Sequence, residues 1–197
     1  MVDTVPWLQR DGANPPGAKI EGTNTVHPRE MGSGERDVED PAQLDLQLGP
    51  DSLARAQALI DELSRAHSLQ HCALFLWDPA VRRLRLAAHH WGAGEDLGEV
   101  RAGAWTIGLN GVCGRAFTTA VPALVLDVED DPDFLSFPGS RTRSELAVPI
   151  FLDARPMGVV NVESPRVAAY GPAEVEALSS WADLVGEAIR SFYVGPA

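Results

Sequence analysis

Only two cysteines occur in the 197 residues of the chain, Cys72 and Cys113, and they lack the C-x-x-C spacing of a zinc or thioredoxin-type site. They are too few for a disulfide framework, so both are expected to be reduced thiols. Long hydrophobic runs are also missing, and the first ten residues lack the basic start and apolar segment of a signal peptide. We therefore expect a cytoplasmic protein that does not cross a membrane.

Basic residues are scarce as well. The chain has 16 Lys and Arg against 28 Asp and Glu, which gives a formal net charge of −12. Such a surface repels the phosphates of nucleic acids and the headgroups of anionic lipids. Neither nucleic acid nor membrane is therefore expected as a partner. The apolar fraction of 45% is typical of a globular chain with one domain and a substantial core.

The two ends of the chain differ from its middle. Residues 1–50 are rich in proline, glycine, asparagine and charge and show neither the strand nor the helix period. Such a segment buries too little apolar surface to offset the entropy of ordering, so we predict a flexible N-terminal tail at 1–50, a domain at 51–192 and a short C-terminal tail at 193–197. Two apolar patches in the tail, residues 5–8 and 44–48, are alternative docking segments for the domain or for a partner.

Two amphipathic helices are predicted at the ends of the domain. Asp51 is a good N-cap for the first helix, and Gly171-Pro172 opens the second. Their stripes either pack both helices on one face of the same domain or form the interface of a homodimer, and the pattern leaves both alternatives open. The stripes are Leu53, Ala56, Ile60, Leu63 and His67 in the first helix and Val175, Leu178, Ala182, Val185 and Ile189 in the second.

Between the helices the sequence changes to the alternation of β-strands. One antiparallel hairpin is predicted from residues 72–77 and 84–88, and a second from 145–152 and 157–163. Pro149 inside a strand indicates either an edge or a bulge, because proline has no N–H for the ladder. The remaining predicted elements are a strand at 123–126 and a short helix at 108–120.

Five motifs follow one another in this region: GLNGVCGRA at 108–116, VLDV at 125–128, DPDF at 131–134, RSELAVP at 143–149 and GVVNVES at 158–164. In this order they strongly resemble the GAF family. The resemblance implies an α/β (α+β) fold with a GAF-like antiparallel sheet of five or six strands, terminal helices on one face and a loop-covered pocket on the other. It also implies a signal-transduction role, in which a small molecule is sensed or a regulatory protein dimerises.

The resemblance leaves the ligand and any cofactor unknown. The Asn-Lys-x-Phe-Asp-Glu pattern of the cyclic-nucleotide-binding branch does not occur, and neither cysteine has the Cys-His neighbourhood of the bilin-attaching branch. His89 and His90 are adjacent on a strand and point to opposite faces, so no metal site is predicted. Because no kinase, cyclase or helix-turn-helix sequence accompanies the domain, a sensed signal is expected to pass to a separate signalling partner.

The candidate ligand-binding residues come from the irregular middle of the domain and from the strand ends beside it. Aromatic residues there either contact a ligand or fill the cavity, and a buried Arg–Glu pair either anchors a ligand or ties a loop to the sheet. The candidates are Trp91, Trp105, Phe134 and Phe137 as apolar walls, Asp127, Arg143, Ser144, Glu145 and Glu163 as polar anchors, and Cys113 beneath the pocket.

An enzymatic branch of the family, the free methionine-R-sulfoxide reductases, shares the Gly-Val-Cys-Gly element around Cys113. That reaction needs a thiolate to attack the sulfoxide, a second cysteine to resolve the product, and carboxylates to hold the amino group. Glu145 matches the glutamate of the branch's Ser-Glu-Ile, and Asn161-Val162-Glu163-Ser164 stands where the branch has Asp-x-Asp-Ser.

The cysteines of that branch are not matched. Pro138 occupies the position of its catalytic cysteine, and its upstream cysteine falls near residues 102–104, so Cys113 stands alone. We therefore expect a regulatory sensor rather than an enzyme. A reductase that uses Cys113 is one alternative, and an interaction module with a filled pocket is another. The position of Cys113 near a helix start predicts a lowered thiol pKa through the helix dipole.

Overall fold

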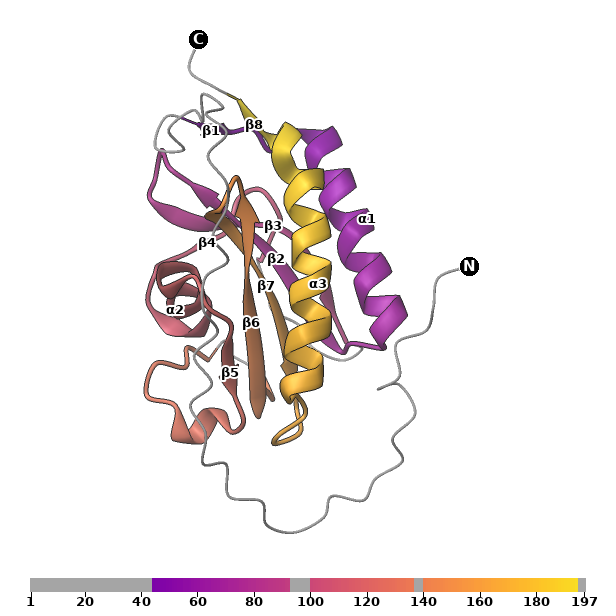
Figure 1. The fold of residues 1–197 in the computed structure, drawn as a ribbon, viewed down its shortest axis with the longest axis vertical. Coiled ribbons are helices and arrows are strands. Elements are labelled where there is room, and N and C mark those ends of the chain that lie inside the picture. Colours follow the sequence, from indigo (N-terminus) through magenta and orange to yellow (C-terminus); the bar gives the residue numbers. More distant parts are fainter. Residues whose placement is uncertain (1–43, 93–99, 137–139, 195–197) are drawn as a thin grey trace, which may run out of the picture. The chain divides into compact units, whose positions relative to one another are not determined.

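The computed structural model describes residues 44–92, 100–136 and 140–194, and Figure 1 shows their fold. A six-stranded sheet with the strand order β4-β3-β2-β7-β6-β5 forms the centre, and all its neighbouring strands are antiparallel. The elements are β1 (Asp45–Leu46), α1 (Pro50–His67), β2 (His71–Asp78), β3 (Arg83–Trp91), β4 (Thr106–Ile107), α2 (Gly111–Thr119), β5 (Ala123–Val125), η3 (Val128–Asp130), β6 (Ser144–Leu152), β7 (Arg155–Ser164), α3 (Pro172–Ile189), η4 (Arg190–Phe192) and β8 (Tyr193–Val194).

The two long helices cover one face of the sheet, and α2 lies on the other (Figure 1). The buried members of both predicted stripes, such as Ile60 in α1 and Ile189 in α3, pack into the core between the helices and the sheet. Gly186 lets α3 approach closely, because a Cβ there would lie 2.2 Å from the Phe151 carbonyl oxygen. The stripes are therefore used within the domain, the first of the two alternatives left open by the pattern.

Both predicted hairpins are confirmed, as β2–β3 and β6–β7, and the pair β2–β7 joins them into one sheet. Strand β5 pairs with residues 145–147 of β6, so within the described part of the chain the outer side of Pro149 has no strand neighbour. The missing N–H of Pro149 therefore removes no ladder bond on that side. The β6–β7 register is also irregular at Ile150/Phe151, next to this proline.

Alternation along the strands separates two apolar layers. On β2, Cys72 and Leu74 belong to the layer beneath α1 and α3, whereas Ala73 and Phe75 belong to the layer beneath α2. The same parity on β7 puts Val162 in the helix-covered layer and leaves Asn161 and Glu163 on the α2 side. This face of the sheet, on which polar side chains are placed among apolar ones, forms the floor of the candidate site.

The fold extends beyond the predicted domain limits of 51–192 at both ends. Strand β1 pairs with β8, with Leu46 opposite Tyr193, and the Gln47 N–H donates to the Phe192 carbonyl oxygen at 2.7 Å. The leucines of the second apolar patch pack against the core, which is why residues 44–50 are ordered rather than part of a tail. The predictions for residues 1–43, including the patch at 5–8, and for 195–197 lie outside the described residues.

Candidate functional site

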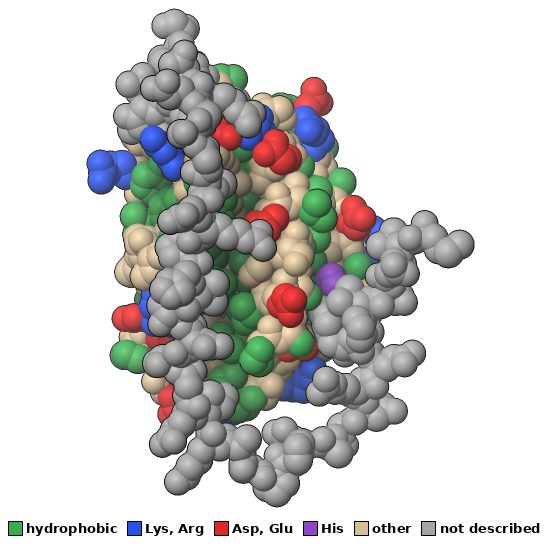
Figure 2. All heavy atoms as spheres, in the orientation of Figure 1, with side chains coloured by type: hydrophobic (Ala, Val, Ile, Leu, Met, Phe, Trp, Pro, Cys, Tyr) green, Lys and Arg blue, Asp and Glu red, His purple; other side chains and the backbone are tan. Residues whose placement is uncertain are grey.

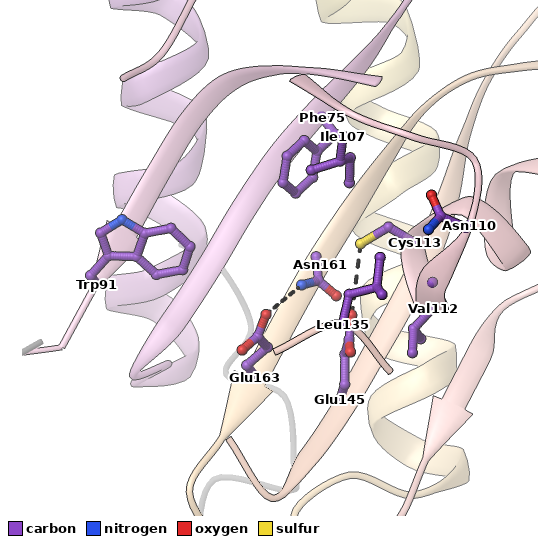
Figure 3. A pocket seen from close by; sticks show the side chains of 11 residues that line it. Phe75, Trp91, Ile107, Asn110, Val112, Cys113, Leu135, Glu145, Asn161 and Glu163 are labelled. Atoms are coloured by element: carbon purple, nitrogen blue, oxygen red, sulfur yellow. Dashed lines mark hydrogen bonds between the residues drawn. The ribbon is translucent and has the colours of Figure 1, made fainter. Parts of the chain in front are cut away.

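A cavity of about 40 Å³ lies between the floor of the sheet and the first turn of α2 (Figure 3). One buried water needs roughly 10–15 Å³, so the cavity has room for a few waters or a small polar group. Its walls are mostly apolar, with a few convergent polar side chains. The lining residues are Phe75, Trp91, Ile107, Asn110, Gly111, Val112, Cys113, Leu135, Glu145, Asn161 and Glu163.

Two glutamates on the floor are the most unusual feature of the cavity. Glu145 on β6 and Glu163 on β7 lie directly opposite each other in the antiparallel register, and only 4% and 6% of their surfaces are exposed. Like charges directly opposite each other on a sheet are destabilising, and glutamates are rarely buried without a partner. The arrangement therefore needs a proton or a cation to be compatible with burial.

Both carboxylates accept hydrogen bonds from neighbouring side chains. Glu163 accepts hydrogen bonds from the Thr142 hydroxyl and from Asn161 Nδ2, the latter at 3.0 Å. The Cys113 thiol donates to Glu145 Oε1 at an S···O distance of 3.7 Å. Asn161 is itself buried, and its Oδ1 has no hydrogen-bond partner within the described structure. Glu145, Glu163 and Asn161 thus converge as acceptors on one side of the cavity (Figure 3).

Burial changes the protonation of both groups on the Cys113 side. Desolvation, together with the charge of Glu163, raises the pKa of Glu145 well above its usual value. Desolvation and the two nearby carboxylates also raise the pKa of Cys113. The predicted lowering of the Cys113 pKa by the helix dipole is therefore wrong, because a dipole term is smaller than the burial of a thiol between two acids.

Four of the predicted ligand-binding residues meet at this cavity: Trp91, Cys113, Glu145 and Glu163. Trp91 is held in place by ring contacts, stacking on His89 at a centroid distance of 5.2 Å. Two further predicted aromatics, Trp105 and Phe134, pack against the core on the same side of the sheet without lining the cavity. Phe137 lies outside the described residues.

The other predicted polar anchors are not in the cavity lining. Arg143 pairs with Asp127, Nη2 to Oδ2 at 2.8 Å, and this pair ties the loop after β5 to the start of β6. Ser144 neighbours Glu145 on β6 and faces the opposite side, where its hydroxyl donates to the Arg166 carbonyl oxygen at 2.7 Å. Arg143 Nη2 also lies 3.5 Å from Glu129 Oε2, so this arginine pairs with two carboxylates that are outside the cavity lining.

Several lining residues were not among the predicted candidates. Phe75 and Asn161 lie on the same face of the sheet as Glu163, so the alternation of side chains along the strands could have identified them. Leu135 gave no such signal, because it lies in an irregular loop whose path depends on tertiary contacts. The lining residues that were missed are Phe75, Ile107, Asn110, Gly111, Val112, Leu135 and Asn161.

The described part of the chain has neither a metal-binding cluster nor a membrane-spanning helix. Within residues 44–92, 100–136 and 140–194, no three His, Cys, Asp or Glu side chains are arranged to hold a metal ion. In the same ranges, no helix is both long and apolar enough to cross a bilayer.

Comparison with known proteins identifies the family. Residues 54–190 match the sequence profile of the GAF domain, which is more than half of the chain. The chain belongs to the GAF domain family. No curated protein matches this GAF domain at the sequence level.

Solved structures similar to this GAF domain include both reductases and signalling domains. A free methionine-R-sulfoxide reductase from Neisseria meningitidis, solved with its substrate, shares 25% identity over 70% of this chain and 77% of its own, with a TM-score of 0.60. A type II free methionine-R-sulfoxide reductase from Thermoplasma acidophilum shares 23% identity over 73% and 96%, with a TM-score of 0.62. The GAF domain of a phosphoenolpyruvate-protein phosphotransferase from Coxiella burnetii shares 16% identity over 73% and 84%, with a TM-score of 0.63.

Proposed function

We propose that this GAF domain is a regulatory sensor whose ligand is a small molecule that presents a cationic amino group to Glu145 and Glu163. One observation carries the proposal: two buried carboxylates face each other across the floor of the cavity, beside Asn161 Oδ1, which has no hydrogen-bond partner among the described residues. An ammonium group supplies three N–H donors and one positive charge. It therefore matches both the acceptor set and the charge of this site.

Charge repulsion between Glu145 and Glu163 gives the site a preference for a cation. Two carboxylate charges about 5 Å apart repel each other by roughly 3 kcal/mol at an effective dielectric constant of about 20. In the ligand-free protein this repulsion is relieved when Glu145 holds a proton, in agreement with the direction of its pKa. A cation that replaces this proton restores the charge balance, while Phe75 and Trp91 offer apolar contacts to the body of the ligand.

Native mass spectrometry of the purified protein, followed by denaturation, tests this proposal. We expect a co-purified mass that is lost on denaturation and corresponds to an amine-containing molecule. The Glu163→Gln variant should lose this mass, whereas Glu62→Gln, which changes an exposed glutamate on α1, should keep it. If the Glu163→Gln variant retains the mass as fully as the wild type, the glutamate pair does not bind the ligand.

The route by which the signal leaves the domain is part of the same proposal. A homodimer through α1 and α3, or a separate signalling partner in the cytoplasm, would use the outer faces of these helices, because their apolar stripes are buried inside. On α3 this outer face carries acidic side chains (Figure 2), and Leu184 beside them is 75% exposed. Light scattering with wild type and Leu184→Glu tests the dimer. If the wild type is a monomer, the signal must instead pass to a separate signalling partner.

A second candidate function rests on the contact between Cys113 and Glu145. In a sulfoxide reductase, the Cys113 sulfur would attack the sulfoxide sulfur as Glu145 accepts the thiol proton and gives its own proton to the sulfoxide oxygen. Transfer of the resulting hydroxyl from the sulfoxide sulfur to Cys113 breaks the S–O bond and gives a thioether and a cysteine sulfenic acid. Cys72 cannot resolve this acid, because its thiol points to the other side of the sheet, toward the Ile60 carbonyl oxygen at 3.9 Å. Two external thiols would then reduce the sulfenic acid, which releases water and a disulfide.

An activity assay separates the two functions. Free methionine-R-sulfoxide is supplied with dithiothreitol as the external thiol, and methionine formation is measured for the wild type and for Cys113→Ala. The sensor proposal predicts no turnover by either protein. Turnover by the wild type that is lost in Cys113→Ala would establish the reductase instead. A protein that neither turns over nor carries a ligand fits the third alternative, an interaction module with a filled pocket.

A further inference from the structure

One wall of the cavity is a loop rather than a helix or strand. Residues 131–136 follow η3 and contribute Leu135 to the lining. Leu135 lies directly over the start of α2, because a Cβ added to Gly111 would be 3.0 Å from Leu135 Cδ1. Leu135 is also 49% exposed, so its side chain contacts both the cavity and solvent. Movement of this loop is therefore the direct way to enlarge a cavity of about 40 Å³.

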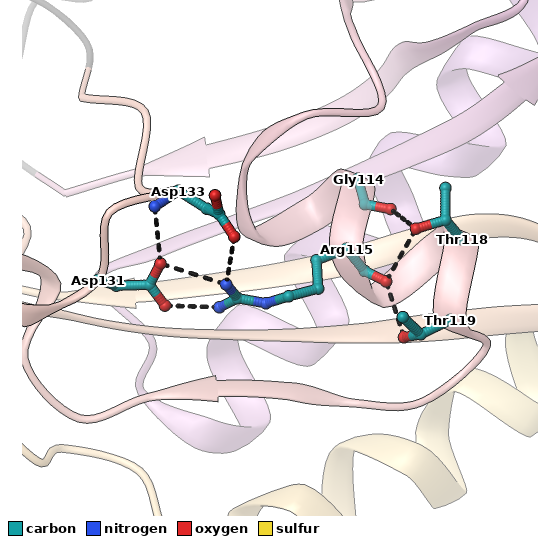
Figure 4. Close-up of polar contacts among 6 residues, drawn as sticks. All are labelled: Gly114, Arg115, Thr118, Thr119, Asp131 and Asp133. Carbon is teal, nitrogen blue, oxygen red and sulfur yellow. Dashed lines mark hydrogen bonds and ion pairs between the residues drawn. The ribbon is translucent and has the colours of Figure 1, made fainter.

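An arginine on α2 holds this loop in place (Figure 4). The Arg115 guanidinium contacts both oxygens of Asp131, with Nη2 to Oδ2 at 2.6 Å and Nη1 to Oδ1 at 3.2 Å. Its Nη1 also donates to Asp133 Oδ2 at 2.9 Å. Paired guanidinium–carboxylate contacts of this kind are strong and fix direction as well as distance.

The arginine is placed where loop and cavity wall meet. Arg115 lies two residues after Cys113 on α2, so one helix supplies both a wall of the cavity and the cation that holds the loop. Asp131 is the better shielded partner, with 13% of its side chain exposed against 58% for Asp133. The pair with Asp131 should therefore contribute more than the pair with Asp133.

We propose that the Arg115–Asp131 ion pair is a latch that keeps Leu135 over the cavity and so controls access to Cys113, Glu145 and Glu163. Breaking the pair frees residues 131–136 to move while the sheet and both long helices stay folded. The latch acts on any molecule that reaches the cavity, so it does not depend on the identity of the ligand.

The two cysteines provide a direct test. Cys113 lies in the cavity beneath the latch, whereas Cys72 lies in the core on the opposite side of the sheet. Two single-thiol proteins, Cys72→Ala and Cys113→Ala, are treated with iodoacetamide, with and without Arg115→Met. We expect Arg115→Met to accelerate alkylation of Cys113 by about tenfold or more and to leave Cys72 unchanged within about twofold. Loss of a nearby cation raises a thiol pKa, so electrostatics alone would slow the reaction.

Control variants make the result specific. Arg190→Met removes an arginine that pairs with Asp153, away from the cavity, and should leave alkylation of Cys113 unchanged. Asp131→Asn should accelerate Cys113 in the same direction as Arg115→Met, and the double variant should be no faster than Arg115→Met. No acceleration of Cys113 in either latch variant, or equal acceleration of Cys113 and Cys72, would overturn the proposal.

Discussion

Replacement of Glu145 by glutamine should stabilise the ligand-free domain at alkaline pH. Glutamine has nearly the same shape, its Oε1 still accepts from the Cys113 thiol, and its amide can donate to Glu163 across the strands. The change removes one of two carboxylates that face each other in a buried site. Two facing carboxylates that suit a cationic ligand lower the free energy of unfolding when no ligand is bound.

The pH dependence of the effect follows from the direction of the pKa. Because the Glu145 pKa is raised in the folded state, the native protein binds more protons than the unfolded chain once the pH exceeds about 4.3, the ordinary value for glutamate. The free energy of unfolding of the wild type therefore falls as pH rises, until the folded pKa is passed. The advantage of Glu145→Gln should be near zero at about pH 4 and should reach about 1–3 kcal/mol or more at about pH 8, because ionised Glu145 carries both the cost of desolvation and the repulsion from Glu163.

Urea unfolding at a series of pH values between about 4 and 8.5 measures this difference, with Glu62→Gln as the matched control for loss of an exposed charge. For a domain of this size, each 1 kcal/mol also appears as a rise of about 2–4 °C in Tm. A Glu145→Gln protein that is less stable than the wild type at pH 8, or a difference that does not change with pH, would refute the reasoning.

Three other predictions concern the ligand, α3 and the C-terminal strand. Affinity for a cationic amine should rise with pH as Glu145 loses its proton, and calorimetry in buffers of different ionisation enthalpy should show proton release on binding. Gly186→Ala should lower the free energy of unfolding by about 2 kcal/mol or more, because its Cβ would overlap the Phe151 carbonyl oxygen, while Leu184→Ala should change it by less than about 0.5 kcal/mol. Tyr193→Phe removes a hydroxyl that bonds two main-chain carbonyls and should cost about 1–2 kcal/mol in urea unfolding.

Much of the fold was predictable because its elements are long enough to show a period. The two long helices and both hairpins repeat their apolar residues over several turns or strand positions, and all were found near their observed bounds. Strands β1, β4 and β8 have two residues each and show no period, so only their tertiary partners determine them. The same reason explains why regular structure extends beyond residues 51–192.

In the candidate site, residues on regular strands were predictable, whereas residues in loops were not. Glu145 and Glu163 lie on strands, where a motif and the alternation together fix position and direction. Asp127 and Arg143 lie next to strand ends, where the path of the loop decides which way a side chain points, and they pair with each other outside the cavity lining. The pKa of Cys113 was predicted in the wrong direction because burial is a property of the whole fold.

The pairing of β1 with β8 has a mechanical consequence. Asp45 lies opposite Val194, so the chain enters and leaves the domain at the same end of a two-stranded ribbon. Tension applied through the two flanking segments would pull this ribbon apart like a zipper, breaking its few hydrogen bonds in turn before any load reaches the six-stranded sheet. Under such a pull, β1 therefore separates from β8 first, and the cavity on the far side of the sheet keeps its shape.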